Sequence, residues 1–216
     1  MDTIEINEHP LLDAIAFVSR FPQTLQELPS PGSLRDFFQL EANAPLERSA
    51  ESKKAVRDLL RWGGYKPSGR NKPASEYLIT AVEKGWLNPE AGINIAVDIV
   101  NAVSLHSALP ISVLDADLLE SPLRISVCEE KIDYIFNPSG QTLSLSGLLC
   151  LFDSEGPCGS PVKDSQRTKT HEETRRTLTI IWGTKDLPHR SAATLDWYLK
   201  LLEPTGAQTE IICGAP

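Results

Sequence analysis

The chain has 216 residues, of which 41 % are hydrophobic and 23 % charged, and its formal net charge is −8. This composition is typical of a globular protein with a sizeable core, and it excludes a disordered, collagen-like or coiled-coil chain. No apolar run approaches the roughly 18 residues of a membrane span, and residues 1–10 carry no Lys or Arg, which excludes a signal or transit peptide. We therefore expect a cytoplasmic protein without a membrane partner.

Apolar residues recur with helical spacing in five segments of the first half of the chain. The clearest runs from Ser49 to Trp62, where lysines and arginines lie opposite the apolar side and Gly63-Gly64 ends the helix. A loop rich in Pro and Gly follows over residues 65–73. The predicted helices cover residues 11–20, 33–40, 49–62, 75–86 and 94–109.

The second half of the chain is predicted to form mainly strands. Two alternating segments flank Glu129–Lys131 and predict a β-hairpin, whereas residues 153–163 predict a loop. The predicted strands cover residues 123–128, 132–136, 142–152 and 178–182, and a closing helix covers 196–202. Because helices come first and strands later, the predicted fold class is α+β rather than a wound parallel sheet.

The apolar helix predicted over residues 94–109 carries one polar stripe. Asn94, Asp98 and Asn101 fall at positions i, i+4 and i+7, which share one face of a helix. Buried polar groups need hydrogen bonds, so the stripe either braces neighbouring backbone or lines a polar pocket. We expect it to be partly buried and hydrogen-bonded across to residues 162–170.

The charge is unevenly distributed along the chain. Residues 48–84 carry a net charge of +5 and residues 163–176 one of +2, although the whole chain is acidic. Local charge sets the field at a surface, so these two basic islands favour contact with a polyanion; two solvated faces are the alternative. If the polyanion is RNA, we expect phosphate contacts from Arg57, Arg61, Lys66, Arg70 and Lys72.

Common catalytic and metal-binding motifs are absent from the sequence. There is no G-x-S-x-G, Walker loop, G-x-G-x-x-G or H-E-x-x-H. The four cysteines are scattered without C-x-x-C spacing, which is typical of free thiols in a reduced cytosol. The four histidines are scattered too, and structural or surface roles are expected for them. The sequence predicts no metal site and no cofactor.

Polar side chains are concentrated in the segment Pro161–Thr170. Thr170–Glu173 has the S/T-x-x-E form of a capping box and predicts a helix that begins there. The N–H groups of a helix N-terminus attract an anion, and Lys163, Arg167 and Lys169 add positive charge. The segment therefore indicates a site for a phosphate or carboxylate, with an ordinary solvated loop as the alternative.

A series of short motifs follows in order along the chain: Asn94, Asp98, Asn101, Ser104, Leu105, Leu109, Pro110 and Asp115, then Gly147, Leu148 and Asp153, then Val162 to Ser165, and Thr168, Lys169, Thr170 and Thr174. Together they resemble the B3/B4 tRNA-binding domain of the beta subunit of bacterial phenylalanyl-tRNA synthetase, which also occurs as stand-alone proteins. The likeness covers about residues 49–203. It implies an α+β fold around a cleft, assigned here to residues 46–216. Residues 1–45 are not explained by the likeness and are expected to form an N-terminal helical extension.

In the synthetase, this module hydrolyses tyrosine mischarged onto the phenylalanine tRNA, and the aminoacyl-adenosine end of the tRNA enters the cleft. The other synthetase domains are missing here, so a complete ligase is not expected. The resemblance implies catalytic roles for Lys163, Asp164, Thr168 and Thr170. It implies substrate contacts from Asn94, Asp98, Asn101, Ser112, Gly147 and Lys169, and we expect a further contact from Arg167 because of its positive charge in the same loop.

One departure from the family concerns catalysis. Editing-competent relatives have a histidine in the stretch that reads Leu109–Asp115 here, and Ser112 occupies its position. The acidic residue near the family's Gly-Gly-Glu segment has no secure counterpart in Cys158–Ser160. Hydrolysis thus lacks its expected base, while binding is unaffected.

The sequence therefore predicts a B3/B4-type protein that binds tRNA or the aminoacyl-adenosine end of tRNA, and not DNA. A trans-editing aminoacyl-tRNA hydrolase is one alternative, and a binder of an amino acid or nucleotide in the same cleft is another. The +5 island favours RNA over a small ligand, because only RNA needs extended phosphate contacts.

Overall fold

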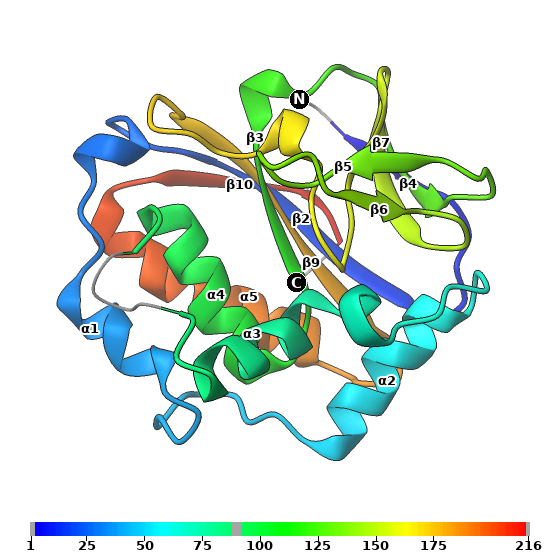
Figure 1. Cartoon of the computed structure of the whole chain (residues 1–216). Helices are drawn as coiled ribbons and strands as arrows, with labels where there is room; N and C mark the ends of the chain where they lie inside the picture. Colours follow the sequence, from blue (N-terminus) through cyan, green and yellow to red (C-terminus); the bar gives the residue numbers. More distant parts are fainter. Residues whose placement is uncertain (1–2, 88–91, 215–216) are drawn as a thin grey trace.

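The central element of the computed structural model, which describes residues 3–87 and 92–214, is a sheet with strand order β10-β2-β9-β3 (Figure 1). Neighbouring strands are antiparallel, and β2 pairs with β9 over nine residues. The bounds are Leu12–Arg20 for β2, Ile111–Asp115 for β3, Arg176–Thr184 for β9 and Gln208–Cys213 for β10. Because β2 and β9 are buried over most of their length, they form the middle of the core.

The helix predicted over residues 11–20 is wrong, because this segment is strand β2. Its residues from Ala14 to Ser19 are all buried, which leaves no solvent face for an amphipathic helix. A short run of consecutive apolar residues fits a strand that is covered on both faces as well as it fits a helix. The predicted boundary between residues 45 and 46 remains a prediction.

A second sheet has strand order β1-β4-β7-β8, and a two-stranded sheet pairs β5 with β6. β1 is parallel to β4 and the remaining pairs are antiparallel. The bounds are Ile4–Ile6 for β1, Leu123–Val127 for β4, Asp133–Ile135 for β5, Thr142–Ser144 for β6, Leu149–Asp153 for β7 and Gly156–Gly159 for β8. β8 lies in a segment that was predicted to be a loop.

The predicted hairpin between β4 and β5 is wrong, because β4 pairs with β7 and β5 pairs with β6. The extended run predicted over residues 142–152 is divided into strands β6 and β7. β6 pairs with β5 and β7 pairs with β4, so the two strands of the expected hairpin have separate partners. The division falls at Leu145–Leu148, where Gly147 has a φ of +75°.

The helices lie mainly on one side of the central sheet, and β4 and β7 lie on the other side (Figure 1). Most of these helices were predicted from the sequence. Ser49 caps α2 and Asn94 caps α4, and the side chain of each accepts a backbone N–H. α4 contacts α3, α5 and β3, so its apolar surface is covered almost all round. The bounds are Gly32–Arg35 for α1, Ala50–Arg61 for α2, Ala74–Glu83 for α3, Ile95–Ser107 for α4 and Arg190–Leu202 for α5.

The helix predicted to begin at Thr170 is wrong, because residues 171–175 form turns that lead into β9. The Thr174 hydroxyl accepts the His171 N–H at 2.9 Å and donates to the Asp115 carboxylate. The Thr174 carbonyl oxygen accepts the N–H of Leu25. Pairing with the N-terminal segment thus overrides the local capping signal.

The predicted α+β class is confirmed, with mixed sheets and packed helices. None of the described helices has the length and apolarity that crossing a membrane requires.

Gly147 packs closely against another part of the backbone, so we expect a larger residue at this position to destabilise the protein. A Cβ at this residue would lie 2.5 Å from the Gly63 carbonyl oxygen and 2.9 Å from the Tyr65 nitrogen, at a φ of +75°. Gly140 has a similar φ, +77°, with open space around it, and serves as the matched control.

We expect Gly140→Ala to lower the free energy of unfolding by about 1 kcal/mol, from backbone strain alone. Gly147→Ala adds a backbone collision and should cost about 2 kcal/mol or more. Urea unfolding of both variants measures the difference. Equal losses in the two variants would contradict the close packing of Gly147.

Candidate functional site

Asp164 and Ser112 form the centre of a polar network between β3 and the loop after β8. The Ser112 hydroxyl donates to Asp164 Oδ1 at 2.6 Å, and the Ser160 N–H donates to the same oxygen at 3.1 Å. The Trp182 indole N–H donates to Ser112 Oγ at 2.9 Å. The Ser112 hydroxyl also lies 3.3 Å from the Ser160 carbonyl oxygen, and since Ser112 is only 1 % exposed, its hydroxyl is committed to partners within the protein.

Tyr134 and Ser160 contact the same loop at the backbone of Lys163. The Tyr134 hydroxyl donates to the Lys163 carbonyl oxygen and lies 2.9 Å from Ser160 Oγ. Thr168 is fully buried, and its hydroxyl donates to the Cys158 carbonyl oxygen at 3.0 Å. Thr168 therefore braces the backbone and does not open onto a cavity.

Burial raises the pKa of the Asp164 carboxyl to about 6. The hydrogen bonds from Ser112 and the Ser160 N–H, and the charge of Lys169, act in the opposite direction and limit the rise. The pKa of this carboxyl therefore lies well above that of an ordinary aspartate.

Lys163 and Lys169 converge on Phe136, the residue after β5. The Lys163 ammonium lies 4.0 Å from the centre of the Phe136 ring, and the Lys169 ammonium donates to the Phe136 carbonyl oxygen at 2.5 Å. Lys163 also donates to the Arg70 carbonyl oxygen at 3.2 Å. These residues, Arg70, Phe136, Lys163 and Lys169, are called the cation cluster below.

The charges of the cation cluster are poorly compensated. Burial, together with the positive charges of Arg70 and Lys169, lowers the pKa of Lys163. Burial also lowers the pKa of Lys169, although Asp164 partly offsets this. Among the described residues, no carboxylate oxygen lies within 4.0 Å of either ammonium. The arrangement is therefore chemically suited to bind an anion.

The polar stripe of α4 is divided between two surroundings. Asn94 Nδ2 donates to Thr170 Oγ1 at 3.2 Å, as expected for a contact with residues 162–170. Asp98, 4 % exposed, instead accepts hydrogen bonds from the Ser30 hydroxyl and the Ile93 N–H. Asn101 lies further along α4 and is half-buried.

Asn94, Asp98 and Thr170 line a cavity of about 530 Å³, which the segment from Leu25 to Arg35 closes on one side. The contributions of that segment could not be read from the motifs, because its residues lie outside them. The cavity is separate from the network of Ser112 and Asp164.

The structure places two further predicted substrate contacts away from the cation cluster. Arg167 forms a bidentate ion pair with Asp153, at 2.9 and 2.8 Å, and its guanidinium also lies 3.1 Å from Glu155. Gly147 packs against Gly63 and Tyr65.

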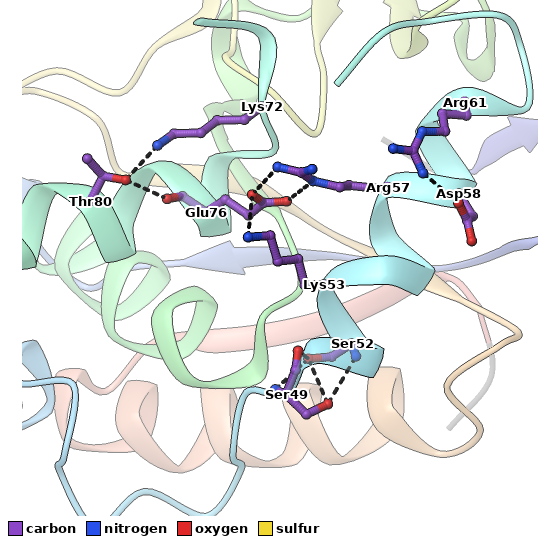
Figure 2. A network of polar contacts seen from close by, with 9 residues as sticks. All are labelled: Ser49, Ser52, Lys53, Arg57, Asp58, Arg61, Lys72, Glu76 and Thr80. Carbon is purple, nitrogen blue, oxygen red and sulfur yellow. Dashed lines mark hydrogen bonds and ion pairs between the residues drawn. The ribbon is translucent and has the colours of Figure 1, made fainter. Parts of the chain in front are cut away.

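The predicted RNA contacts fall into two groups, and Figure 2 shows three of them, Arg57, Arg61 and Lys72. On α2, Arg57 pairs with Glu76 at 2.6 and 2.7 Å, and Arg61 pairs with Asp58 at 2.8 Å. In the loop before α3, Lys66 and Arg70 are exposed, and Lys72 donates to the Thr80 hydroxyl at 2.6 Å. Much of the positive charge of α2 is therefore neutralised within the protein.

Comparison with known proteins identifies the family. A family model described as the B3/4 domain matches residues 68–188, more than half of the chain. The chain belongs to the B3/4 domain family, as the motifs indicated. A search of curated proteins finds no match.

Among solved structures, the chain is similar to an N-terminal fragment of the phenylalanyl-tRNA synthetase beta-subunit from Pyrococcus horikoshii. The sequences are 11 % identical, the TM-score is 0.49, and the alignment covers 96 % of this chain and 50 % of that one. The chain thus spans about half the length of that fragment.

Three residues of the site were missed from the sequence. Tyr134, Phe136 and Trp182 were assigned only to strands, because a strand pattern does not show which side chain has a polar partner. No described group of three or more His, Cys, Asp or Glu side chains is arranged to hold a metal ion.

The raised pKa of Asp164 predicts a change of stability with pH. The native state keeps a proton that the unfolded chain releases between about pH 4 and pH 6. This contribution to stability is complete below about pH 4 and is lost as the pH rises through 6. Asp164→Asn keeps the shape of the side chain and removes the titration.

We expect the free energy of unfolding of the wild type, relative to Asp164→Asn, to be about 1 kcal/mol larger at pH 5 than at pH 7. Urea unfolding at the two pH values measures this. A difference that does not change with pH, or that changes in the opposite direction, would contradict the environment described for Asp164.

Proposed function

We propose that this protein binds tRNA through its aminoacyl-adenosine end, and that Lys163 and Lys169 contact phosphate there. The observation that carries the proposal is the cation cluster: two lysine ammonium groups converge on Phe136, no described carboxylate oxygen lies within 4.0 Å of either, and burial lowers the pKa of both. Keeping such charges partly buried is costly, and an anionic ligand recovers that cost.

A terminal nucleotide matches the chemistry of this region. A phosphate would accept hydrogen bonds from the two ammonium groups, which lie together beside the half-buried Phe136. Membership of the B3/4 family, together with the resemblance to the synthetase domain, makes tRNA the favoured polyanion. The buried or half-buried cysteines are free thiols, which agrees with action in the cytoplasm.

Hydrolysis of a mischarged aminoacyl-tRNA is the alternative, and the geometry favours it less. Ser112 stands where a histidine base is expected, and its hydroxyl already bonds Asp164 and Trp182. Asp164 Oδ1 already accepts from Ser112 and from the Ser160 N–H. A binder of a free amino acid or nucleotide would use the same cluster but would not need the exposed Lys66 and Arg70.

The binding proposal predicts a specific change in salt dependence. Lys163→Gln and Lys169→Gln should each weaken tRNA binding and reduce the slope of log K against log salt by about one. Arg61→Gln is the matched control, since Asp58 already neutralises that guanidinium, and it should change the slope little. Fluorescence anisotropy with labelled tRNA between 50 and 200 mM salt is the measurement. Equal slopes in all four proteins would contradict the proposal.

A deacylation time course tests the alternative. With tyrosine esterified to the phenylalanine tRNA, we expect the wild-type protein to leave the spontaneous rate of hydrolysis unchanged. Asp164→Ala is the comparison, because Ser112→His would overpack a site that is 1 % exposed. Rapid hydrolysis by the wild type that Asp164→Ala abolishes would establish an enzyme.

A further inference from the structure

Two exposed aromatic side chains next to α3 are each paired with a lysine. Tyr77 is 47 % exposed, and the Lys72 ammonium lies 5.6 Å from the centre of its ring. Trp86 is 59 % exposed, and the Lys84 ammonium lies 4.5 Å from the centre of its ring. Aromatic rings that are exposed beside cations can stack on the bases of a single-stranded nucleic acid.

The first pair and Lys84 lie along one face of the helix, and Trp86 follows just beyond its C-terminal end. Tyr77, Thr80 and Lys84 occupy positions i, i+3 and i+7, which lie on one stripe. Lys72 reaches back to this stripe, because its ammonium donates to Thr80 Oγ1 at 2.6 Å. Lys72, Tyr77, Lys84 and Trp86 are called the α3 track below.

The acidic residue in the first turn of α3 points away from the track. Glu76 faces α2, where it is bound by Arg57 and lies 3.7 Å from Lys53 (Figure 2). The track therefore presents lysines and aromatic rings without that carboxylate beside them. The same pairing explains why part of the +5 island is neutral and part is not.

The track begins beside the cation cluster. The Arg70 carbonyl oxygen accepts from Lys163, and the Ala74 N–H donates to the Pro161 carbonyl oxygen at 2.9 Å. These two contacts tie the loop before α3 to the loop that carries Lys163. The pair of Lys163 and Phe136, at 4.0 Å, continues the same alternation of cation and ring.

We propose that the α3 track binds single-stranded RNA, with bases stacked on Tyr77 and Trp86 and phosphates held by Lys72 and Lys84, and that it guides the strand to the cation cluster. Every base has a flat face, so stacking of this kind tolerates any sequence. A duplex hides those faces, which makes a single strand the partner that fits. The proposal rests on the proposed function and adds the path and the form of the RNA.

The experiment compares three RNAs by fluorescence anisotropy: a trinucleotide, a single strand of 12 nucleotides and a duplex of 12 base pairs. The variants are Tyr77→Ala and Trp86→Ala, with Tyr77→Phe and Trp86→Phe as conservative versions that keep a ring. Trp62→Ala is the matched control, because Trp62 is 51 % exposed but lies after α2 and contacts His9. Circular dichroism checks that each variant is folded.

We expect Tyr77→Ala and Trp86→Ala each to weaken binding of the long single strand by roughly 5- to 150-fold. The phenylalanine variants and Trp62→Ala should bind within about twofold of the wild type, and the trinucleotide, held by the cation cluster, should be unaffected by any of them. The duplex should bind the wild type more weakly than the long single strand.

Other outcomes separate the two proposals. If the alanine variants bind the long strand like the wild type while Lys163→Gln binds it weakly, the α3 track is overturned and the proposed function stands. If the wild type binds none of the RNAs, both are overturned. If the duplex or an acidic peptide binds as tightly and the alanine variants weaken it equally, the surface is not a single-strand site and the inference fails.

Discussion

The arrangement of the site depends on one hydrogen bond, from the Ser112 hydroxyl to the Asp164 carboxylate at 2.6 Å. This bond joins strand β3 of the central sheet to the loop that follows strand β8 of the second sheet. The Trp182 indole on β9 donates to the serine, so a residue of the core helps to set the position of this loop. Because the bond is shielded from water, breaking it would leave Asp164 Oδ1 with one hydrogen bond fewer, held by the Ser160 N–H, at a cost of about 1–3 kcal/mol.

Holding the loop in this way brings positive charges together at the surface. Lys163 and Lys169 flank Asp164 in the chain, and both ammonium groups reach Phe136. Within the loop, only the carboxylate of Asp164 acts on these charges, and it is already hydrogen-bonded to Ser112 and Ser160. The cations of the cation cluster are thus poorly compensated, whereas the arginines of α2 are neutralised by carboxylates. In an acidic chain, this difference is the physical basis for expecting an anionic ligand at the cation cluster.

The sequence predicted more of the fold than of the site. Ser49–Trp62 was predicted well because its capping residue, apolar spacing and final glycines agree. Residues 11–20 were misassigned because burial on both faces removes the periodicity that separates a strand from a helix. The capping signal at Thr170 was overridden by backbone pairing with residues 25 and 26, and charge counting could not show that Glu76 lies against Arg57. Such contacts join residues that are far apart in sequence, which a local pattern cannot show.

The central claim is that Lys163 and Lys169 are partly desolvated cations that bind an anion. NMR of the lysine side chains tests this claim most directly. Adenosine 5′-monophosphate, which carries the phosphate and the base of a terminal nucleotide, is the probe. Without it, both ammonium groups should titrate below the ordinary lysine range; at saturation, both pKa values should rise as the phosphate pairs with them. Ordinary lysine pKa values that the nucleotide leaves unchanged would contradict the account.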